Sequence, residues 1–576
     1  MRRLGLMILA ASVALSIASV AQAVPDSCGV VLGPGLGSGR TAYHQNYDRT
    51  LSVDSLYYLT GLYYVDSTFS ITIPAGTTVL GDTAAALIVT RGAKIYAAGT
   101  VDSPIVFSSM KPAGQRQRGD WGGVIILGKA PCNQVEPLIE GGIIGGTYGG
   151  TDPHHNSGVF EYVRIEFPGY RFQLNNEVNG LTMGGVGDST EIHHIQVSYS
   201  FDDSYEWFGG TVNAHHLVAF GGTDDEFDTD FGFKGKCQFL FGLRDPGMWD
   251  PTGESNGFES DNEGTAPYEH QPWTKPIFSN VTLVGPARVD SLWPLLPPGN
   301  KFQYGAVIRR STQLCCYNSV IAGYPWGVSL RDVHTKEWAN VDTLQWRDVS
   351  VAACTNPAGS THVHDESKWP AADAITPGIL AWFNTSLPVD YRNWFSTAVP
   401  VPRTINSLFT NMRNLNDPDP TPAVGSELRG NARWIWPNVQ DPFFVQVDYR
   451  GAFVPDVPMP QQWTAGWTDF DPQSANHYAS VVRRTGHGSR VSLLAQNSPN
   501  PFNPSTTIRF SIPEKTMVSL KVFNVQGQTV VTLVDGELAA GSYERTVNTG
   551  ELAPGTYFYS LSGKGFNETR KMVVLK

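Results

Sequence analysis

Short runs of β-branched and other apolar residues alternate with glycine-containing turns in the first part of the chain. Four consecutive runs show the pattern: ITIPAGTTVLG (71–81), ALIVTRGAKIYAAGT (86–100), PIVFSS (104–109) and WGGVIILG (121–128). Each run is about as long as one strand and ends at a turn residue. No amphipathic helix separates the runs, which argues against a doubly wound α/β fold and favours short strands stacked in a solenoid.

One repeat can be read directly from the sequence. Residues 192–210, IHHIQVSYSFDDSYEWFGG, align with residues 214–232, AHHLVAFGGTDDEFDTDFG, at a constant offset of 22 residues. Both segments place a His-His pair, an Asp-Asp pair, an aromatic residue, an acid and a final glycine at the same positions. A period near 22 residues fits one coil of a parallel β-helix, whose coils stack about 4.7–4.9 Å apart.

We therefore predict an all-β chain whose main part, residues 51–355, is a right-handed parallel β-helix. Later runs such as FSNVTLVG (278–285), YNSVIAG (317–323) and WRDVSVAA (346–353) are typical of further coils separated by loops. An antiparallel sandwich with a local duplication is the alternative.

The parts outside this range differ in composition. Residues 24–50 form an N-terminal segment. Residues 356–489 are rich in tryptophan and proline and predict an extension or cap of the β-helix, because a solenoid needs its end covered. The tryptophans could also stack on sugar rings, although buried packing is their more common use. Residues 490–576 contain short alternating strands separated by turns, which predict a small C-terminal β-sandwich.

The first 23 residues are typical of a secretory signal peptide. Arg2 and Arg3 precede a mostly apolar stretch, residues 4–20, and AQA at 21–23 has the small-x-small pattern of a cleavage site. A membrane anchor is the alternative, but the stretch is short for a span. No later segment approaches the ~20 apolar residues of a membrane-spanning helix, so none is expected in the mature chain.

Charge and cysteine content narrow the function classes. The formal net charge is −12 and the sequence has no stripe of Lys and Arg, so nucleic acid is not an expected partner. The six cysteines permit up to three disulfides in an exported protein, with the pairing open. The adjacent Cys315 and Cys316 are not expected to bond to each other. The sequence contains no Cys-x-x-Cys motif and no His-rich spacing of the kind that is typical of zinc sites.

The 22-residue offset stacks two acidic blocks on each other. Like charges in successive coils repel, and a proton or a bound cation would relieve the repulsion. Calcium takes six to eight oxygen ligands, many of them carboxylates. We therefore predict a calcium site between the coils; the alternative is that the acids are solvated on turns or cap backbone N–H groups. The predicted ligands are Asp202, Asp203, Glu206, Asp224, Asp225, Asp228 and Asp230.

Other residues of the repeat suggest further functions. Tyr205, Trp207 and Phe227 lie beside the acids and are predicted to contact a bound ligand if they line one open groove with them. Stacked carboxyls also suit the separations of a glycosidase, but stacking gives such separations to any repeated acid. The two His-His pairs could bind a transition metal or simply pack. Because neighbours on a strand point to opposite faces, only one histidine of each pair is expected in a given column.

The C-terminal part resembles a known sorting domain. NPFNPSTTIRFSIP, VFNVQGQTV, LAPGTYFYSL and the final RKMVVLK are similar, in this order, to the C-terminal sorting domain of type IX secretion substrates. That domain is related in shape to the immunoglobulin-like module of flagellar hook-capping proteins. The resemblance implies an outer-membrane bacterium and delivery to the cell surface or medium. It also implies that residues 490–576 contact type IX-like secretion machinery.

The main part resembles a family of secreted β-helix proteins that often precede such tails. The matching stretches are WGGVIILGKAP, the two aligned repeats with NEVNGLTMGGVGDST before them, YRGAF and WTAGWTDFDP, and the resemblance covers most of residues 51–472. It implies fold and location but no catalytic residues. We therefore predict a secreted or cell-surface β-helix protein with a structural, adhesive or glycan-binding role. The alternative is a polysaccharide lyase or glycoside hydrolase that uses the stacked carboxylates.

Overall fold

The computed structural model describes residues 29–172, 178–251, 253–287, 299–353, 363–365, 404–412, 414–477 and most of 500–575, with single positions at 297, 494 and 497. The predicted signal peptide, residues 1–23, lies outside the described residues. The chain divides into two compact units, one spanning residues 30–490 and one that includes residues 491–576. Each unit is described by itself below.

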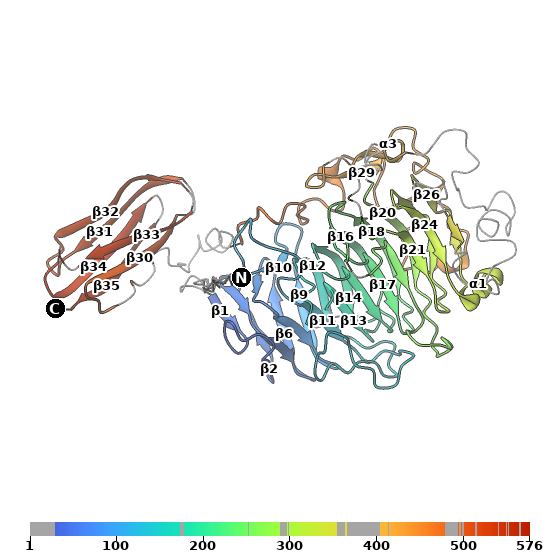
Figure 1. Ribbon diagram of the computed structural model, residues 1–576, viewed down its shortest axis with the longest axis horizontal. Helices are drawn as coiled ribbons and strands as arrows, with labels where there is room; N and C mark the ends of the chain where they lie inside the picture. The colour runs from blue at the N-terminus through green and yellow to red at the C-terminus, as the bar shows by residue number, and fades with distance from the viewer. Residues whose placement is uncertain are drawn as a thin grey trace, which may run out of the picture. The chain divides into compact units, whose positions relative to one another are not determined.

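Parallel strands in two long sheets build the larger unit. Figure 1 shows the coils side by side, from β1 in blue to β24 in yellow-green. The 11-stranded sheet has the order β2 (Ala42–Gln45), β5 (Leu62–Val65), β8 (Ala86–Val89), β11 (Gly123–Leu127), β13 (Leu181–Gly184), β15 (Tyr205–Phe208), β17 (Phe227–Asp230), β19 (Phe258–Ser260), β21 (Tyr304–Ile308), β24 (Trp326–Leu330) and β27 (Val363–Asp365).

The second sheet has 16 strands and covers the other sides of each coil. Its main path is β1 (Gly29–Leu32), β4 (Leu56–Leu59), β7 (Thr78–Gly81), β10 (Ile105–Ser109), β12 (Gly158–Glu166), β14 (Glu191–Ser198), β16 (Ala214–Phe220), β18 (Lys236–Leu243), β20 (Ile277–Val284), β22 (Cys315–Tyr317) and β25 (Trp346–Arg347). Off this path lie β3 (Arg49–Thr50), β6 (Ser70–Pro74), β9 (Lys94–Ala98), β23 (Val320–Ala322) and β26 (Ser350–Ala352).

The strand register confirms the parallel β-helix and the 22-residue coil. His193 pairs with His215 between β14 and β16, and Tyr205 pairs with Phe227 between β15 and β17. Apolar side chains from both sheets fill the inside of the coils as one continuous core cluster. Burial of this core supplies the main stabilisation, because each coil can cover its apolar face only against its neighbours.

The β-helix extends beyond its predicted bounds of 51–355 at both ends. β2 lies within the predicted N-terminal segment and pairs in parallel with β5. β27 lies beyond residue 355 and pairs with β24. The prediction was too narrow because terminal coils are covered on one side only and carry fewer apolar residues, so their pattern is weak.

The long strands of the 16-stranded sheet bend at one residue in the left-handed backbone region. In β14 and β16 these residues are His194, with φ 53°, and His216, with φ 58°. The equivalent residues of other coils are Tyr162, Phe239, Asn280, Asn318 and Asp348. The bend interrupts the alternation of the strand: Ile192 and Ile195 both face the core, and the two residues between them both face outward.

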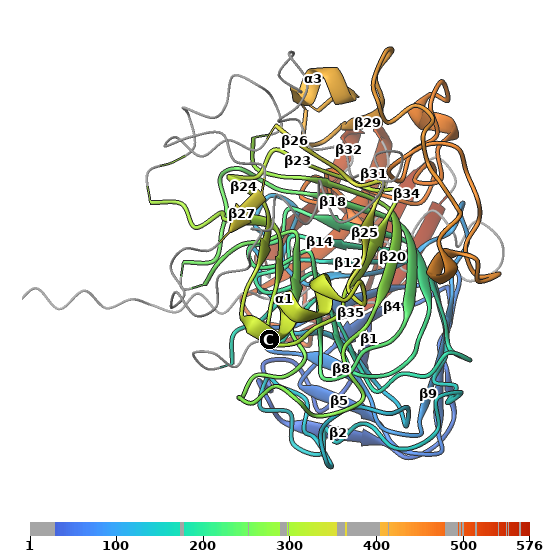
Figure 2. The same cartoon turned by 90° about the vertical axis from the view of Figure 1, so that its right-hand side faces the viewer.

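Residues 404–412 and 414–477, which we call the flank segment, lie along the outside of the 16-stranded sheet (Figure 2). Gln238 accepts from the Val445 N–H and donates to the Val445 carbonyl, and Gln196 forms the same pair of bonds with Asp469. Trp467 is fully buried against the sheet. The flank segment contains α3 (Ile405–Leu408), β28 (Phe409–Asn411), β29 (Asp419–Pro422) and two 3₁₀ turns at Pro437–Val439 and Met459–Gln461, and α1 (Val333–Asn340) lies in the loop between β24 and β25.

A buried ion pair at the end of the flank segment makes its docking depend on pH. The His477 ring lies 2.7 Å from the Glu166 carboxylate, and both side chains are buried. Burial raises the pKa of Glu166, but His477 and Arg164 outweigh this effect and lower the pKa to about 2 from an ordinary 4.5. A lowered carboxyl pKa stabilises the folded state above pH 4.5, and this contribution is lost as pH falls toward 2.

We therefore expect a stabilisation on the order of 3 kcal/mol, of which the His477 part belongs to docking of the flank segment, to disappear between about pH 4.5 and pH 2. Hydrogen exchange of the backbone amides in residues 461–477, corrected for the intrinsic pH dependence, measures this loss. Glu166→Gln is the control, because a neutral side chain makes docking insensitive to pH in this window. Equal pH dependence of the wild type and of this variant would contradict the prediction.

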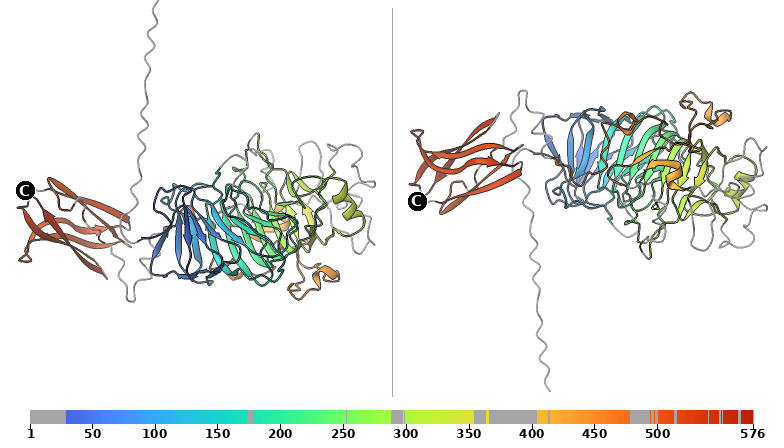
Figure 3. Two further views of the ribbon diagram at one scale, coloured as in Figure 1. Left: turned by 90° about the horizontal axis from the view of Figure 1, so that it is seen from below. Right: turned by 90° about the horizontal axis from the view of Figure 1, so that it is seen from above.

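The C-terminal unit consists of antiparallel strands in two sheets (Figure 3). One sheet pairs β30 (Ser505–Ile512) with β33 (Gly541–Asn548). The other has the order β32 (Thr529–Leu538), β31 (Thr516–Phe523), β34 (Gly555–Gly563) and β35 (Phe566–Val574). Alternate residues of β31, Val518, Leu520 and Val522, are buried, as expected for a strand with one face in a core. The all-β prediction, with a small β-domain at the end, is confirmed.

Candidate metal site

The acidic side chains lie on the outer face of the 11-stranded sheet. Glu206 in β15 pairs with Asp228 in β17, and Asp228 pairs with Glu259 in β19. Thr182 in β13 precedes Glu206 in the same row. Three carboxylates therefore follow one another in successive coils, as the 22-residue offset predicts for the first two.

A second row forms at the turn that enters this sheet. The Asp203 carboxylate accepts from the Asp225 N–H at 2.8 Å, and the Asp225 carboxylate accepts from the Asn256 N–H at 2.7 Å. The Asn256 side-chain oxygen in turn accepts from the Tyr304 N–H at 3.1 Å. Each of the two aspartates uses one carboxylate oxygen to accept a backbone N–H. This is the capping role that the sequence suggests as the alternative to a calcium site.

The two rows bring carboxylate oxygens close enough to share a cation. Three overlapping groups have ligand oxygens within 4.8 Å of one another: Asp202, Asp203 and Asp224; Asp203, Glu206 and Asp228; and Asp225, Asp228 and Glu259. Six of the seven predicted ligands thus come together, and we call them the acidic cluster, with Glu259 as a further member. Among the described residues Asp230 belongs to none of these groups, and its carboxylate accepts from the Phe231 N–H.

Glu259 is a functional candidate that the repeat did not reveal. It lies 31 residues after Asp228 rather than 22, because a loop is inserted between β18 and β19. Glu259 stands in the short sequence GFES, but the constant 22-residue offset does not align it with Asp228.

Burial and mutual repulsion disfavour the charged form of the acidic cluster. Asp203 is 7% exposed and Glu206 is 6% exposed. Burial, followed by neighbouring carboxylates, raises the pKa of Asp203, Glu206 and Asp228 well above its usual range. In the described part of the chain no Lys or Arg forms an ion pair with these three residues, nor with Asp224 or Asp225. Glu259 differs, because Arg309 pairs with it.

Several buried oxygens beside the acidic cluster have no hydrogen-bond partner among the described residues. They are the Asn179 Oδ1, the Thr182 Oγ1 and the Asp228 Oδ1. The Asn179 amide nitrogen donates to Glu206 and to Glu140, and Thr182 and Asp228 are the cross-strand neighbours of Glu206, so all three residues lie next to Glu206. Buried polar atoms are rarely left without a partner, and a set of oxygens alone suits a hard cation such as calcium.

The positively charged guanidinium of Arg244 lies inside the coil, directly beneath this turn. The Arg244 Nε is 2.5 Å from the Glu226 carboxylate, and the Tyr324 hydroxyl donates to the other oxygen of Glu226 at 3.0 Å. The Arg244 guanidinium also donates to the carbonyls of Gly222 and Asn256. All these side chains are buried. Burial raises the pKa of Asp224 and Asp225, and Arg244 acts against this rise.

The prediction that Tyr205, Trp207 and Phe227 contact a ligand is wrong. All three rings are fully buried in the core of the coil, and the Tyr205 hydroxyl donates to the backbone carbonyls of Ile195 and Val218. The reason is the alternation of the strand: Tyr205 and Trp207 flank the outward-facing Glu206, so they must point inward.

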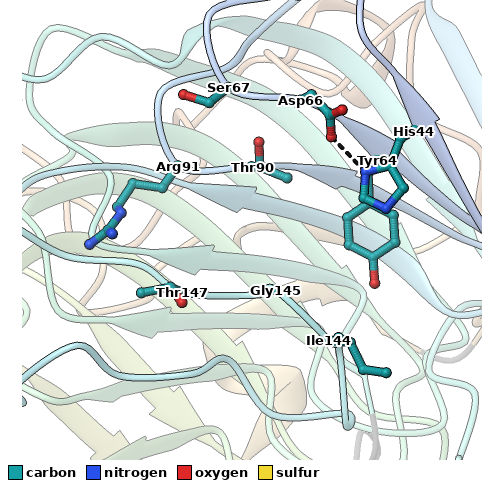
Figure 4. Close-up of a pocket in the computed structure, with 9 residues that line it drawn as sticks. All are labelled: His44, Tyr64, Asp66, Ser67, Thr90, Arg91, Ile144, Gly145 and Thr147. Carbon is teal, nitrogen blue, oxygen red and sulfur yellow. Dashed lines mark hydrogen bonds and ion pairs between the residues drawn. The ribbon is translucent and has the colours of Figure 1, made fainter.

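A separate cleft of about 490 Å³ opens near the first coils (Figure 4). His44 stacks on Tyr64 with ring centroids 4.7 Å apart, and its Nδ1 lies 2.7 Å from the Asp66 carboxylate. No residue of the predicted site lines this cleft. Its lining residues are His44, Tyr64, Asp66, Ser67, Thr90, Arg91, Ile144, Gly145 and Thr147.

Parallel coils stacked in two long sheets define the class of β-solenoid proteins. Residues 42–378 match the family model of the pectate-lyase-like β-helix domain, which is more than half of the 576 residues, so the chain belongs to this family. Residues 498–575 match the secretion-system C-terminal sorting domain. No curated protein matches the chain.

The sorting domain makes this a secreted or cell-surface protein of an outer-membrane bacterium, exported by the type IX route. Its C-terminal unit is the part that the secretion machinery recognises. Within the described residues, no helix combines the length and the apolar character that crossing a membrane requires.

Proposed function

We propose that this protein is a calcium-stabilised β-helix that serves outside the cell as a structural, adhesive or glycan-binding scaffold. The observation that supports the proposal best is the centre of the acidic cluster, where Asp203, Glu206 and Asp228, which form no ion pair with Lys or Arg among the described residues, meet buried oxygens without hydrogen-bond partners there. A cation at this place would join two successive coils and cancel a repulsion that the fold otherwise retains.

Calcium fits this set of ligands better than other common cations. The donors are carboxylate, amide and hydroxyl oxygens, with no imidazole or thiolate among them. Asp203, Glu206 and Asp228 would hold the ion, and Asn179 and Thr182 would add neutral oxygens. Magnesium demands a near-ideal octahedron at shorter distances, whereas calcium accepts irregular sets of six to eight oxygens. Extracellular calcium modules work at about 10⁻⁴–10⁻³ M, which suits an exported protein.

Calcium titration of the full chain by calorimetry, with parallel melting curves, tests the proposal. We expect saturable binding and a melting temperature that rises with calcium and falls with a chelator. Magnesium at the same concentration should give a smaller shift. Glu206→Gln should abolish the response, whereas Asp230→Asn, a change outside the acidic cluster, should preserve it. A melting temperature that is equal in calcium and in chelator would contradict the proposal.

Polysaccharide cleavage is the second candidate function. It is favoured by the raised pKa of the Glu206 and Asp228 carboxyls, because a glycosidase needs one protonated carboxyl as general acid. The deep burial of Glu206 weighs against it. Release of reducing ends or unsaturated uronates from a panel of polysaccharides, abolished by Glu206→Gln and by Asp225→Asn, would establish an enzyme. No release from any member of the panel leaves the scaffold role.

A further inference from the structure

Four histidines form a compact group on the outer corner of the 16-stranded sheet, away from the acidic cluster. The rings of His193 and His215 stack with centroids 4.7 Å apart, and those of His194 and His216 stack at 4.4 Å. The alternation of a regular strand predicts only one histidine of each pair in a column. The left-handed conformation of His194 and His216 instead turns both members of each pair outward, so the two columns lie side by side.

The ring nitrogens of each pair face each other. The Nδ1 atoms of His193 and His194 are 2.9 Å apart, and those of His215 and His216 are 2.7 Å apart. At this distance either one ring donates its Nδ1–H to the Nδ1 of the other, or a cation lies between the two nitrogens.

Glu161 fixes the orientation of one ring. Its carboxylate lies 3.0 Å from the His193 Nε2, and a carboxylate can only accept, so the proton of a neutral His193 sits on Nε2. The His193 Nδ1 therefore keeps its lone pair and faces the His194 Nδ1. A carboxylate behind the far nitrogen of a histidine is the usual arrangement around a metal-bound imidazole.

We propose that these four imidazoles bind one late first-row transition-metal ion of the zinc type, with Glu161 as the residue that positions His193. Nitrogen donors select Zn²⁺, Cu²⁺ or Ni²⁺ over the calcium that oxygen donors select. The donor atoms of His194, His215 and His216 lie within 4.8 Å of one another. A tetrahedral zinc ion with bonds of about 2.0–2.1 Å needs its nitrogens about 3.3 Å apart, so the rings must turn about their side-chain bonds while the strands keep their spacing.

Aromatic rings enclose this group. Tyr162 stacks on His194 at 4.3 Å and Phe239 stacks on His216 at 5.0 Å. Trp463 of the flank segment lies 5.0 Å from His216. An apolar wall of this kind limits access of water to the ring nitrogens and strengthens metal bonds made there. It also places an indole close to the metal, where a paramagnetic ion quenches its fluorescence.

Zinc titration of the full, untagged chain in millimolar calcium tests the inference, since calcium then occupies the oxygen ligands. Competition with a chromophoric chelator should give one zinc per chain. Cobalt(II) at the same site should show the visible absorption of tetrahedral nitrogen coordination, and copper(II) should quench tryptophan fluorescence in the same stoichiometry. Equal binding of zinc and magnesium, or no zinc binding, would overturn the inference.

Variants separate this site from other histidines. His215→Gln combined with His216→Gln should remove zinc binding, whereas His154→Gln, at an exposed histidine elsewhere, should leave it unchanged. Glu161→Gln retains all four ligands and should weaken zinc binding about 10–100-fold. Unchanged zinc affinity in Glu161→Gln overturns the positioning role even if the double variant fails to fold. Retained calcium response in each variant shows that the acidic cluster is a different site.

Discussion

Arg244→Met is expected to lower the free energy of unfolding of the β-helix by about 3–5 kcal/mol, because it leaves the buried Glu226 carboxylate without its positively charged partner. The guanidinium is fully buried and forms the one ion pair of Glu226 among the described residues. Its removal leaves a carboxylate inside the coil that has lost its positive partner and keeps the Tyr324 hydroxyl as a donor. It also leaves the carbonyls of Gly222 and Asn256 without the donor they now share.

The pH dependence of this variant carries further information. Burial raises the pKa of Glu226 to about 7 even though Arg244 lowers it. A raised carboxyl pKa means that the folded state favours the protonated form, so stability falls as pH rises from 4.5 through 7. Without the guanidinium the neutral form is favoured more strongly. The penalty of Arg244→Met should therefore be smaller at pH 5 than at pH 8.

Urea or thermal unfolding followed by far-ultraviolet circular dichroism measures the penalty. Lys236→Met is the matched control, because its ion pair with Asp441 is partly exposed to solvent and is expected to contribute below about 1 kcal/mol. Glu226→Leu added to Arg244→Met should recover much of the loss, since no buried charge remains. A penalty for Arg244→Met no larger than that of the control would contradict the structural role given to Arg244.

The fold could be predicted to a large extent because a solenoid repeats its pattern in the sequence. The constant offset between the two acidic blocks correctly pairs His193 with His215 and Glu206 with Asp228. Period-two alternation, applied to β15, also places Tyr205 inside the coil. The aromatic residues are also close to the acids in the sequence, which suggests that their rings lie beside a ligand. In the structure the alternation of the strand determines their position, and the rings face the core.

Other features could not be read from the pattern. The left-handed conformation at His194 is a local backbone state that a histidine shares with many residue types, so the outward pairing of the histidines was hidden. Glu259 was hidden by a loop insertion that breaks the period. Arg244 looks like any basic residue at the end of a strand, and its role depends on the closure of the coil around Glu226.

Asp203→Asn combined with Asp225→Asn is expected to reverse the order of stability between the wild type and the variant when calcium is added. The row at this turn already holds Asn256, whose amide oxygen accepts a backbone N–H as the two aspartates do. Asparagine at both positions therefore preserves the backbone bonds while it removes two carboxylates that repel each other and their neighbours.

In chelator, the variant should melt above the wild type, because relief of repulsion between buried carboxylates is worth about 1–3 kcal/mol. In calcium at about 100 times its dissociation constant, the wild type should gain about 2.7 kcal/mol by ligand binding and the variant should gain little. The test is to measure the melting temperatures of both proteins in chelator and in calcium, with Asp230→Asn as control. Curves that shift in parallel with calcium would show that Asp203 and Asp225 hold no calcium, whereas a crossing would show that the repulsion between these carboxylates is relieved by a bound ion.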